Sequence, residues 1–283
     1  MTATLKDVAA RAGVSTSAVS RTFTDGASVS VKMRRKVERA AAELGYSPNF
    51  LARSLTTRRT KLIGLVSNNF HNPIFLEVFD RFTRSLQDRG LRPLLVNLSN
   101  ETDPENSVRM LRQYSVDGVI VASSTLPPAF SKAFRDKGIP VVNTFGRHSS
   151  SPEVHVVGID NVAAGRLAAR ELVARNYKSV AFLGGPQSAT STKDRLKGFS
   201  EELALHPDIA VSHSYAAAYS FKAGRAEMLR LARGELAEAY FCGDDVLSIG
   251  ALSALDEIGK HVPEDVGVIG LNDMEMAGWE NID

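Results

Sequence analysis

The stretch "LKDVAARAGVSTSAVSR", residues 5–21, predicts two short helices that meet at a tight turn. Its first half places apolar side chains on one helical stripe, at Leu5, Val8, Ala9 and Ala12. That helix should stop at Gly13, and the hydroxyl of Ser15 can then cap a second helix running to about Thr22. This arrangement decides the fold of the N-terminal part of the chain.

The second helix would turn Val19 and Phe23 inward and leave small or hydrogen-bonding side chains outward, where they suit base edges. Residues 29–48, "VSVKMRRKVERAAAELGYSP", then predict a third helix that ends at Gly45. Its apolar stripe is Met33, Val37, Ala40, Ala41 and Leu44. Three helices in under fifty residues would close a small core.

The net charge of +2 conceals an asymmetry. Residues 1–61 hold twelve Lys or Arg against four Asp or Glu, a net +8, whereas the rest hold 22 against 28, a net −6. A basic head on an acidic body indicates a polyanion that binds the head alone. The alternative is a helical bundle that only supports another element, and the charge and the hydroxyl-rich outer face argue against it.

From residue 61 apolar runs of strand length alternate with helical patterns. The expected strands lie in residues 61–67, 91–98, 116–122, 139–145, 154–160, 178–184, 238–243 and 265–273. Such alternation predicts parallel sheets covered by helices on both faces. Four strands before about residue 146 and at least four after it suffice for two doubly wound lobes, and two lobes are favoured over one overlong sheet.

Several classes of protein are disfavoured by the sequence. It has no run of about 18 apolar residues, and "MTATLKDVAA" at its start is unlike a secretory signal, so we expect a cytoplasmic protein without a membrane segment. Cys242 is the single cysteine, which rules out an internal disulfide and predicts a small buried side chain. The six histidines lack metal-ligand spacing, so no metal or other cofactor is expected.

Ligands of open α/β sheets bind at the carboxyl ends of the strands. The loops expected there, including residues 67–75, 184–195 and 270–275, are rich in Asn, Asp, Ser, Arg and aromatic residues. This mixture suits a neutral or acidic polyhydroxylated ligand. The pair Asp244 and Asp245 could act in acid–base chemistry, but Asp245 is better explained as the cap of the helix that follows. Nucleotide-binding, serine-hydrolase and zinc-protease motifs are missing, so an enzyme is disfavoured.

"LKDVAARAGVSTSAVSR", "VSVKMRRKVERAAAELGYSPN" and "LARSL" resemble, in order and spacing, the head motifs of the lactose-repressor/galactose-repressor (LacI) family of bacterial transcription regulators. The resemblance implies a helix-turn-helix head over residues 1–46 whose second helix lies in the major groove. Thr16, Ser17 and Arg21 would read bases, and Ala18 would add an apolar contact. Phosphate contacts would come from Thr4, Ser15, Ser20, Val29, Ser30 and Arg34.

Residues 47–60, "SPNFLARSLTTRRT", correspond by the same resemblance to the family's hinge helix and linker. A free helix of this length is marginal in water. Leu51 would pack on its partner in a second subunit, and Leu55 would wedge into the minor groove at the centre of a palindromic operator. Asn49 and Arg53 would line that groove.

The resemblance continues through "IDNVAAGRLAARELVARNYKSVAFLGGP" and "SIGALSALDEIGKHVPEDVGVIGLND". It implies a homodimer whose body, residues 61–283, has two Rossmann-like lobes of the periplasmic-binding-protein-like type, about 61–158 and 159–283. An effector between them would contact Ile74, Phe75, Ser123, Phe145, Asp160, Ser191, Arg195, Tyr219, Asp244 and Asn272. Arg195 would be the main polar anchor, Asp244 and Asn272 would hold hydroxyls, and Phe75 and Tyr219 would form walls.

This chain departs from the family pattern at three places. Many relatives have Asp where it has Asn272, which bears on the charge of the ligand. The purine-responsive branch has an extra arginine where it has Ala189, which argues against a purine. The family continues beyond "GWENID" with a strand, a crossover and a closing helix, so we expect a less stable body and impaired dimerisation or switching in the chain as it stands.

The sequence therefore predicts a DNA-binding repressor of carbohydrate uptake or catabolism genes, controlled by a small sugar-like effector. A periplasmic sugar receptor without a role on DNA is the first alternative, and the basic head and the missing signal argue against it. A sugar-active enzyme is the second.

Overall fold

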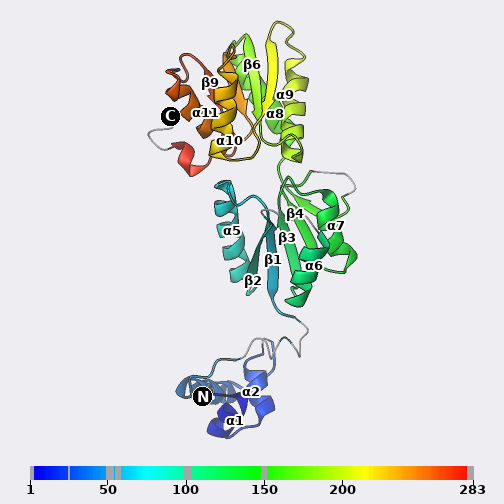
Figure 1. Cartoon of the computed structure of the whole chain (residues 1–283). Helices are drawn as coiled ribbons and strands as arrows, with labels where there is room; N and C mark the ends of the chain where they lie inside the picture. The colour runs from blue at the N-terminus through cyan, green and yellow to red at the C-terminus, as the bar shows by residue number, and fades with distance from the viewer. Residues whose placement is uncertain are drawn as a thin grey trace. The chain divides into compact units, whose positions relative to one another are not determined.

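Residues 3–24, 26–48, 54, 59–98, 104–147 and 152–278 are described by the structure, a computed structural model. Contacts divide the chain into two units, residues 1–60 and residues 61–283 (Figure 1).

The described residues of the first unit up to residue 48 form α1 (Leu5–Ala12), α2 (Thr16–Thr22) and α3 (Val31–Glu43). Helix α1 ends at Gly13, whose φ of 55° lies in the left-handed region that glycine adopts without strain. The side chain of Ser15 then caps α2, as predicted. The buried core of the unit is formed by Val8, Ala9, Ala12, Val19, Val37, Ala40 and Ala41.

The sequence placed Leu44 last on the core-facing apolar stripe of the third helix, and this prediction is wrong. Leu44 is 36% exposed, because α3 ends at Glu43 and Gly45, with φ 61°, turns the chain. The amide of Tyr46 donates to the carbonyl of Ala41 at 2.8 Å, and its ring packs against the core instead, 5.9 Å from the ring of Phe23.

The second unit begins with a sheet of five parallel strands in the order β2-β1-β3-β4-β5. The strands are β1 (Leu62–Ser67), β2 (Arg92–Asn97), β3 (Gly118–Ala122), β4 (Val141–Thr144) and β5 (His155–Val157). Helix α5 (Ile74–Asp88) packs on one face through Phe75 and Phe79. Helices α6 (Pro104–Gln113) and α7 (Pro128–Asp136) cover the other face, where Leu111, Phe130 and Phe134 are fully buried.

A second sheet of four parallel strands follows in the order β7-β6-β8-β9. The strands are β6 (Ser179–Gly184), β7 (Ala210–Tyr215), β8 (Ala239–Cys242) and β9 (Gly267–Ile269). The helices are α8 (Asn161–Ala174), α9 (Thr190–Leu203), α10 (Phe221–Leu231), α11 (Asp245–Glu257) and the short 3-10 helix η1 (Glu275–Gly278). Helices α8 and α9 cover one face of this sheet, and α10 and α11 cover the other (Figure 1). The prediction of two doubly wound lobes is confirmed.

Two strands differ from the expected assignment. The strand count divided the lobes at about residue 146, but β5 pairs with β4 and completes the first sheet, which agrees with the expected first lobe of about 61–158. Strand β7, "AVSHSY", was not predicted, because it lies at a sheet edge, is largely exposed and lacks a continuous apolar run.

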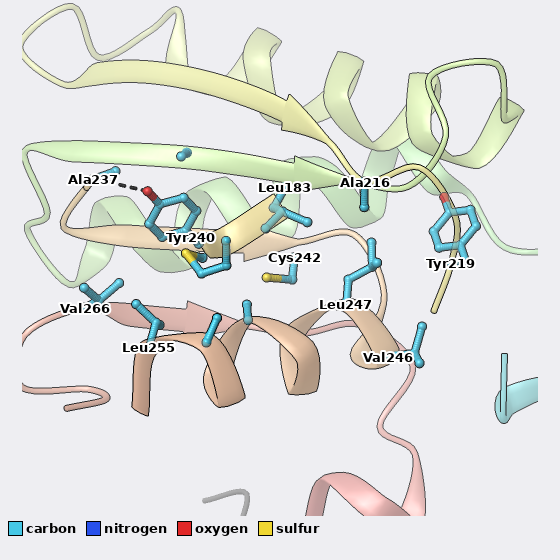
Figure 2. Packing of buried hydrophobic residues seen from close by; sticks show 14 of the residues in the cluster. Leu183, Ala216, Tyr219, Ala237, Tyr240, Cys242, Val246, Leu247, Leu255 and Val266 are labelled. Carbon is cyan, nitrogen blue, oxygen red and sulfur yellow. Dashed lines mark hydrogen bonds between the residues drawn. The ribbon is translucent and has the colours of Figure 1, made fainter. Parts of the chain in front are cut away.

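The core between the second sheet and α10 and α11 contains Cys242 (Figure 2). Its side chain is fully buried among Leu183, Tyr240 and Leu247, and burial raises the pKa of the thiol to about 12. Cys242 is therefore the unreactive, buried side chain that the sequence predicts.

Helices α8 and α9 cross with their backbones in contact. A Cβ atom added to Gly165 would overlap the carbonyl oxygen of Arg195, and one added to Gly198 would overlap the carbonyl oxygen of Val162. Only glycine fits at either position. The crossing thus fixes α9, and with it Arg195, against the first turn of α8.

We expect Gly198→Ala to lower the free energy of unfolding of the body by about 1–3 kcal/mol, the usual cost of overpacking. The gain of roughly 1 kcal/mol in helix propensity cannot compensate, because the obstructing atom belongs to the backbone. The measurement is urea unfolding followed by circular dichroism. Gly234→Ala is the matched control, because a Cβ atom there has its nearest neighbour at 3.8 Å. Equal stability of the two variants would contradict the close crossing.

Candidate functional site

Helix α2 presents a polar face to solvent. Thr16, Ser17, Ser20 and Arg21 are exposed, Ala18 is half-buried, and Val19 and Thr22 on the opposite side are buried. The predicted base-reading side chains therefore share the free side of a helix that the core holds in place. The hydroxyl groups of Ser15 and Ser17 lie 2.9 Å apart.

The hydroxyls of Thr4, Ser15 and Ser30 cap the three helices of the head. They accept the amides of Asp7 at 3.3 Å, Ala18 at 3.2 Å and Met33 at 3.2 Å, respectively. The hydroxyl and the amide of Thr4 both donate hydrogen bonds to the carboxylate of Asp7. These bonds lower the pKa of that carboxyl, the hydroxyl having the larger effect. Because a helix N-terminus carries partial positive charge, three of the predicted phosphate-binding residues lie where an anion is favoured.

Arg34 has a role within the head that the sequence did not reveal. Its Nη1 donates to the carbonyl oxygen of Thr22 at 2.8 Å, at the C-terminal end of α2. The side chain thereby joins α3 to the C-terminal end of α2. Val29, also predicted to contact phosphate, is half-buried just before α3. The predicted hinge residues Asn49, Leu51, Arg53 and Leu55 lie outside the described residues.

The body contains a cavity of about 110 Å³ between its two lobes. Eight of the ten predicted effector residues line it: Ile74, Phe75, Phe145, Ser191, Arg195, Tyr219, Asp244 and Asn272. Five further residues that the sequence did not single out complete the lining, namely Asn69, Asn72, Ser124, Ile159 and Asn161. Asn69 and Asn72 lie in the loop 67–75 that was expected at a strand end, which was the available signal for these two.

Asp244 is the most densely bonded side chain of the cavity. Its Oδ2 accepts from Asn72 Nδ2 at 3.0 Å and Asn272 Nδ2 at 3.1 Å, and its Oδ1 accepts the amide of Val246 at 3.0 Å. Burial raises the pKa of this carboxyl, and the three N–H donors and the positive charge of Arg195 oppose that effect.

The predicted cap of α11 is therefore corrected by one residue. Asp244 caps the helix, because its backbone is extended and its carboxylate faces the free amides. Asp245 is the first helical residue, and its Oδ2 instead accepts the amide of Met274 at 2.8 Å.

Arg195 lies on α9 and is 7% exposed. Its Nε donates to Asn161 Oδ1 at 2.8 Å, and its Nη1 donates to the carbonyl oxygen of Gly243. A guanidinium held at two of its nitrogens presents its remaining N–H groups in a fixed direction.

Aromatic rings form part of the cavity wall. The rings of Phe75 and Phe145 lie 5.1 Å apart at an angle of 41°. Across the cavity, the hydroxyl of Tyr219 lies 3.0 Å from Ser191 Oγ and 2.7 Å from Thr192 Oγ1. These contacts orient both walls of the cavity.

Two predicted effector residues do not line the cavity. Ser123 Oγ donates to Asn68 Oδ1 at 2.8 Å and accepts the amide of Leu126 at 3.1 Å, so it organises its own loop while Ser124 faces the cavity. The exposed Asp160 caps α8 by accepting the amides of Val162 and Ala163, each at 3.0 Å, and its neighbours in the chain line the cavity instead.

A larger apolar groove of about 590 Å³ lies at the amino ends of the first sheet's strands, against Ile63, Val119 and Val141. It contains no predicted site residue, and it lies at the opposite strand ends from those where α/β sheets bind ligands. Within the described ranges, no cluster of His, Cys, Asp or Glu could hold a metal ion, and no helix could cross a membrane.

Comparison with known families matches both units. Residues 4–49 match "Bacterial regulatory proteins, lacI family", and residues 60–281 match "Periplasmic binding proteins and sugar binding domain of LacI family". The chain is 34% identical to the HTH-type transcriptional repressor PurR of Pectobacterium carotovorum, over 97% of this chain and 82% of that protein. It is 33% identical to the HTH-type transcriptional regulator CelR of Thermobifida fusca, over 97% and 83%.

Solved structures give the same result. The lac repressor dimer bound to operator and the anti-inducer ONPF superposes with a TM-score of 0.85 at 26% identity, over 98% of this chain and 84% of that one. The complex of the regulator CelR with cellobiose gives a TM-score of 0.63 at 31% identity, over 95% and 82%. The chain therefore belongs to the LacI family, and it is a DNA-binding transcription regulator with an effector-binding domain.

Proposed function

We propose that this regulator represses genes of carbohydrate uptake or catabolism as a homodimer on palindromic operator DNA in the cytoplasm. A small, hydroxyl-rich effector would bind in the cavity between the lobes and change the affinity for the operator. The observation that carries this proposal is the composition of the cavity, in which one buried cation and one buried carboxylate are accompanied by four asparagines and three aromatic rings.

The charges of Arg195 and Asp244 balance, so the cavity suits a neutral ligand better than a phosphate or a dianion. Asparagine side chains both donate and accept hydrogen bonds, as hydroxyl groups require, and the rings of Phe75 and Tyr219 suit the C–H face of a sugar. The likeness to a regulator crystallised with cellobiose supports the same ligand class.

A volume of about 110 Å³ is smaller than the roughly 300–1,000 Å³ of typical ligand pockets. A sugar would therefore enter only after the lobes separate, and they would close again around it. Binding would shift the population between arrangements of the dimer that do and do not present two heads at the operator spacing.

On the DNA, Thr16, Ser17 and Arg21 would contact bases, with Ala18 as an apolar neighbour. The phosphates would be held by Thr4, Ser15, Ser20, Val29, Ser30 and Arg34. Exposure of the polar face of α2 and the N-terminal positions of three of these hydroxyls support these roles. The segment with Asn49, Leu51, Arg53 and Leu55 would act in the minor groove.

Selection from random duplexes should recover a palindrome, and we expect Arg21→Gln to bind it about 5- to 150-fold more weakly, because a guanidinium–base contact is worth about 1–3 kcal/mol. Binding to scrambled DNA should fall much less. Gel shifts under rising salt measure both, and affinity should drop steeply because the release of counterions on binding becomes less favourable as salt rises. Arg11→Gln is the control, since Arg11 pairs with Glu43 at 2.5 Å inside the head. No enriched palindrome, or equal losses for both variants, would contradict the assignment.

Leu55→Ala should weaken binding to the palindrome far more than binding to scrambled DNA, because an apolar wedge contributes only where the duplex is kinked at the operator centre. The comparison uses the same gel shifts with circularly permuted probes, which report bending. A variant that still bends the operator as the parent does would refute the wedge.

Glucose or cellobiose should raise the melting temperature of the protein, whereas adenosine should not. At a hundred times the dissociation constant, a ligand stabilises by about 2.7 kcal/mol, which is roughly 5–10 °C for a body of this size. Ser191→Ala removes a hydroxyl from the cavity wall and should reduce the shift, while Ser212→Ala, on exposed β7, should not. Stabilisation by adenosine alone would exclude the carbohydrate class.

A further inference from the structure

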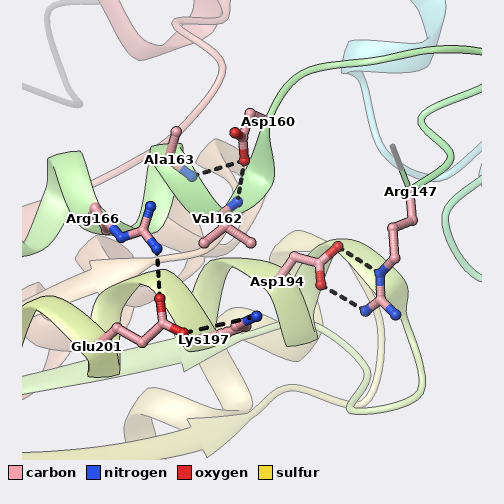
Figure 3. Close-up of polar contacts among 8 residues, drawn as sticks. All are labelled: Arg147, Asp160, Val162, Ala163, Arg166, Asp194, Lys197 and Glu201. Atoms are coloured by element: carbon pink, nitrogen blue, oxygen red, sulfur yellow. Dashed lines mark hydrogen bonds and ion pairs between the residues drawn. The ribbon is translucent and has the colours of Figure 1, made fainter. Parts of the chain in front are cut away.

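One ion pair joins the two lobes beside the effector cavity. Arg147 follows β4 of the first lobe, and Asp194 lies on α9 of the second. Arg147 Nε donates to Asp194 Oδ2 at 2.9 Å and Nη2 donates to Oδ1 at 2.6 Å (Figure 3). Among the ion pairs found between described residues, the others each lie within the head or within one lobe.

The neighbouring charges already have partners. Arg166 and Lys197 both contact Glu201, at 2.6 Å and 3.8 Å, and Asp160 accepts the first amides of α8 (Figure 3). Arg147 is thus the cation that compensates Asp194, and the fork-to-fork geometry fixes their relative orientation as well as their distance.

The pair is attached directly to two walls of the cavity. Arg147 lies two residues after Phe145, and Asp194 immediately precedes Arg195. Phe145 and Arg195 both line the cavity, from opposite lobes. A separation of the two lobes at this pair would therefore carry an aromatic wall away from the buried guanidinium.

We propose that Arg147 and Asp194 are positioning residues that hold the effector cavity closed when neither effector nor DNA is bound. The effector role of the cavity rests on the function proposed above, whereas the closing role of the ion pair does not. The pair increases the fraction of molecules whose lobes are closed. The apparent affinity for a ligand that binds only the closed lobes rises by the same factor as that fraction.

The pair biases closure without locking it. The side chain of Arg147 is 54% exposed and that of Asp194 14%, so water and salt screen their attraction. Other links remain when it breaks, among them Asn72 to Asp244 and Thr190, whose amide and hydroxyl donate to the carbonyl of Ser124 at 3.0 Å and 3.2 Å. Loss of an exposed pair should change the ratio of open to closed lobes about two- to fivefold.

The test measures the distance between spin labels on the two lobes of the full chain, without DNA or sugar. Ala129→Cys on α7 and Ser200→Cys on α9 place the labels on exposed positions, and the buried Cys242 stays unlabelled. Labelled chain is diluted into unlabelled chain so that each assembly carries one labelled copy. We expect Arg147→Gln and Asp194→Asn each to increase the long-distance population two- to fivefold, and 1 M NaCl to do the same to the parent.

The exchanged pair, Arg147→Asp with Asp194→Arg, should restore the parental distribution, which a purely local packing role would not do. Arg166→Gln is the matched control, because it breaks an ion pair of the same kind inside one lobe. Unchanged distances in Arg147→Gln and Asp194→Asn, or an equal shift in Arg166→Gln, would overturn the proposal. Neither result would bear on operator binding or sugar binding, which the gel shifts and the melting temperatures test separately.

Discussion

The buried carboxylate of Asp244 is the contact on which the body depends. A charge removed from water is tolerated only when donors replace its hydration, and here three N–H groups do so. One donor is the amide of Val246 at the start of α11, one is Asn272 after β9, and one is Asn72, 172 residues away in the other lobe. A single side chain thus fixes a helix end, the cavity floor and the approach of the lobes.

The contacts inside each lobe differ in kind from the contacts between the lobes. Inside each lobe, apolar side chains and direct backbone contacts hold helices on sheets, as at the crossing of α8 and α9. Between the lobes, the hydrogen bonds and the ion pair are polar contacts that water can replace, and Ile74 of the first lobe adds an apolar contact with the core of the second. Two dense units joined by so few contacts suit hinge motion as rigid bodies.

Local patterns sufficed for most of the fold. The stop at Gly13, the cap at Ser15 and the parallel strands depend on neighbouring residues, and they were predicted. Strand β7 was missed because an exposed edge strand needs no apolar run. At the cavity, the sequence predicted the right loops, but Ser123 and Asp160 each lie one residue from a side chain that lines it. The direction in which a loop side chain points depends on backbone dihedral angles, which the sequence pattern does not reveal. The bond from Asn72 to Asp244 has no local signature at all.

The caps of the head have an evolutionary consequence. Thr4, Ser15 and Ser30 stabilise their helices through the same hydroxyls proposed to meet phosphates, so replacing any of them by a residue that cannot cap costs about 0.5–2 kcal/mol of stability. In the described part of the head, the side chains of Thr16 and Arg21 do not cap a helix. Operator preference can therefore diverge among descendants of this protein while the scaffold that carries it stays the same.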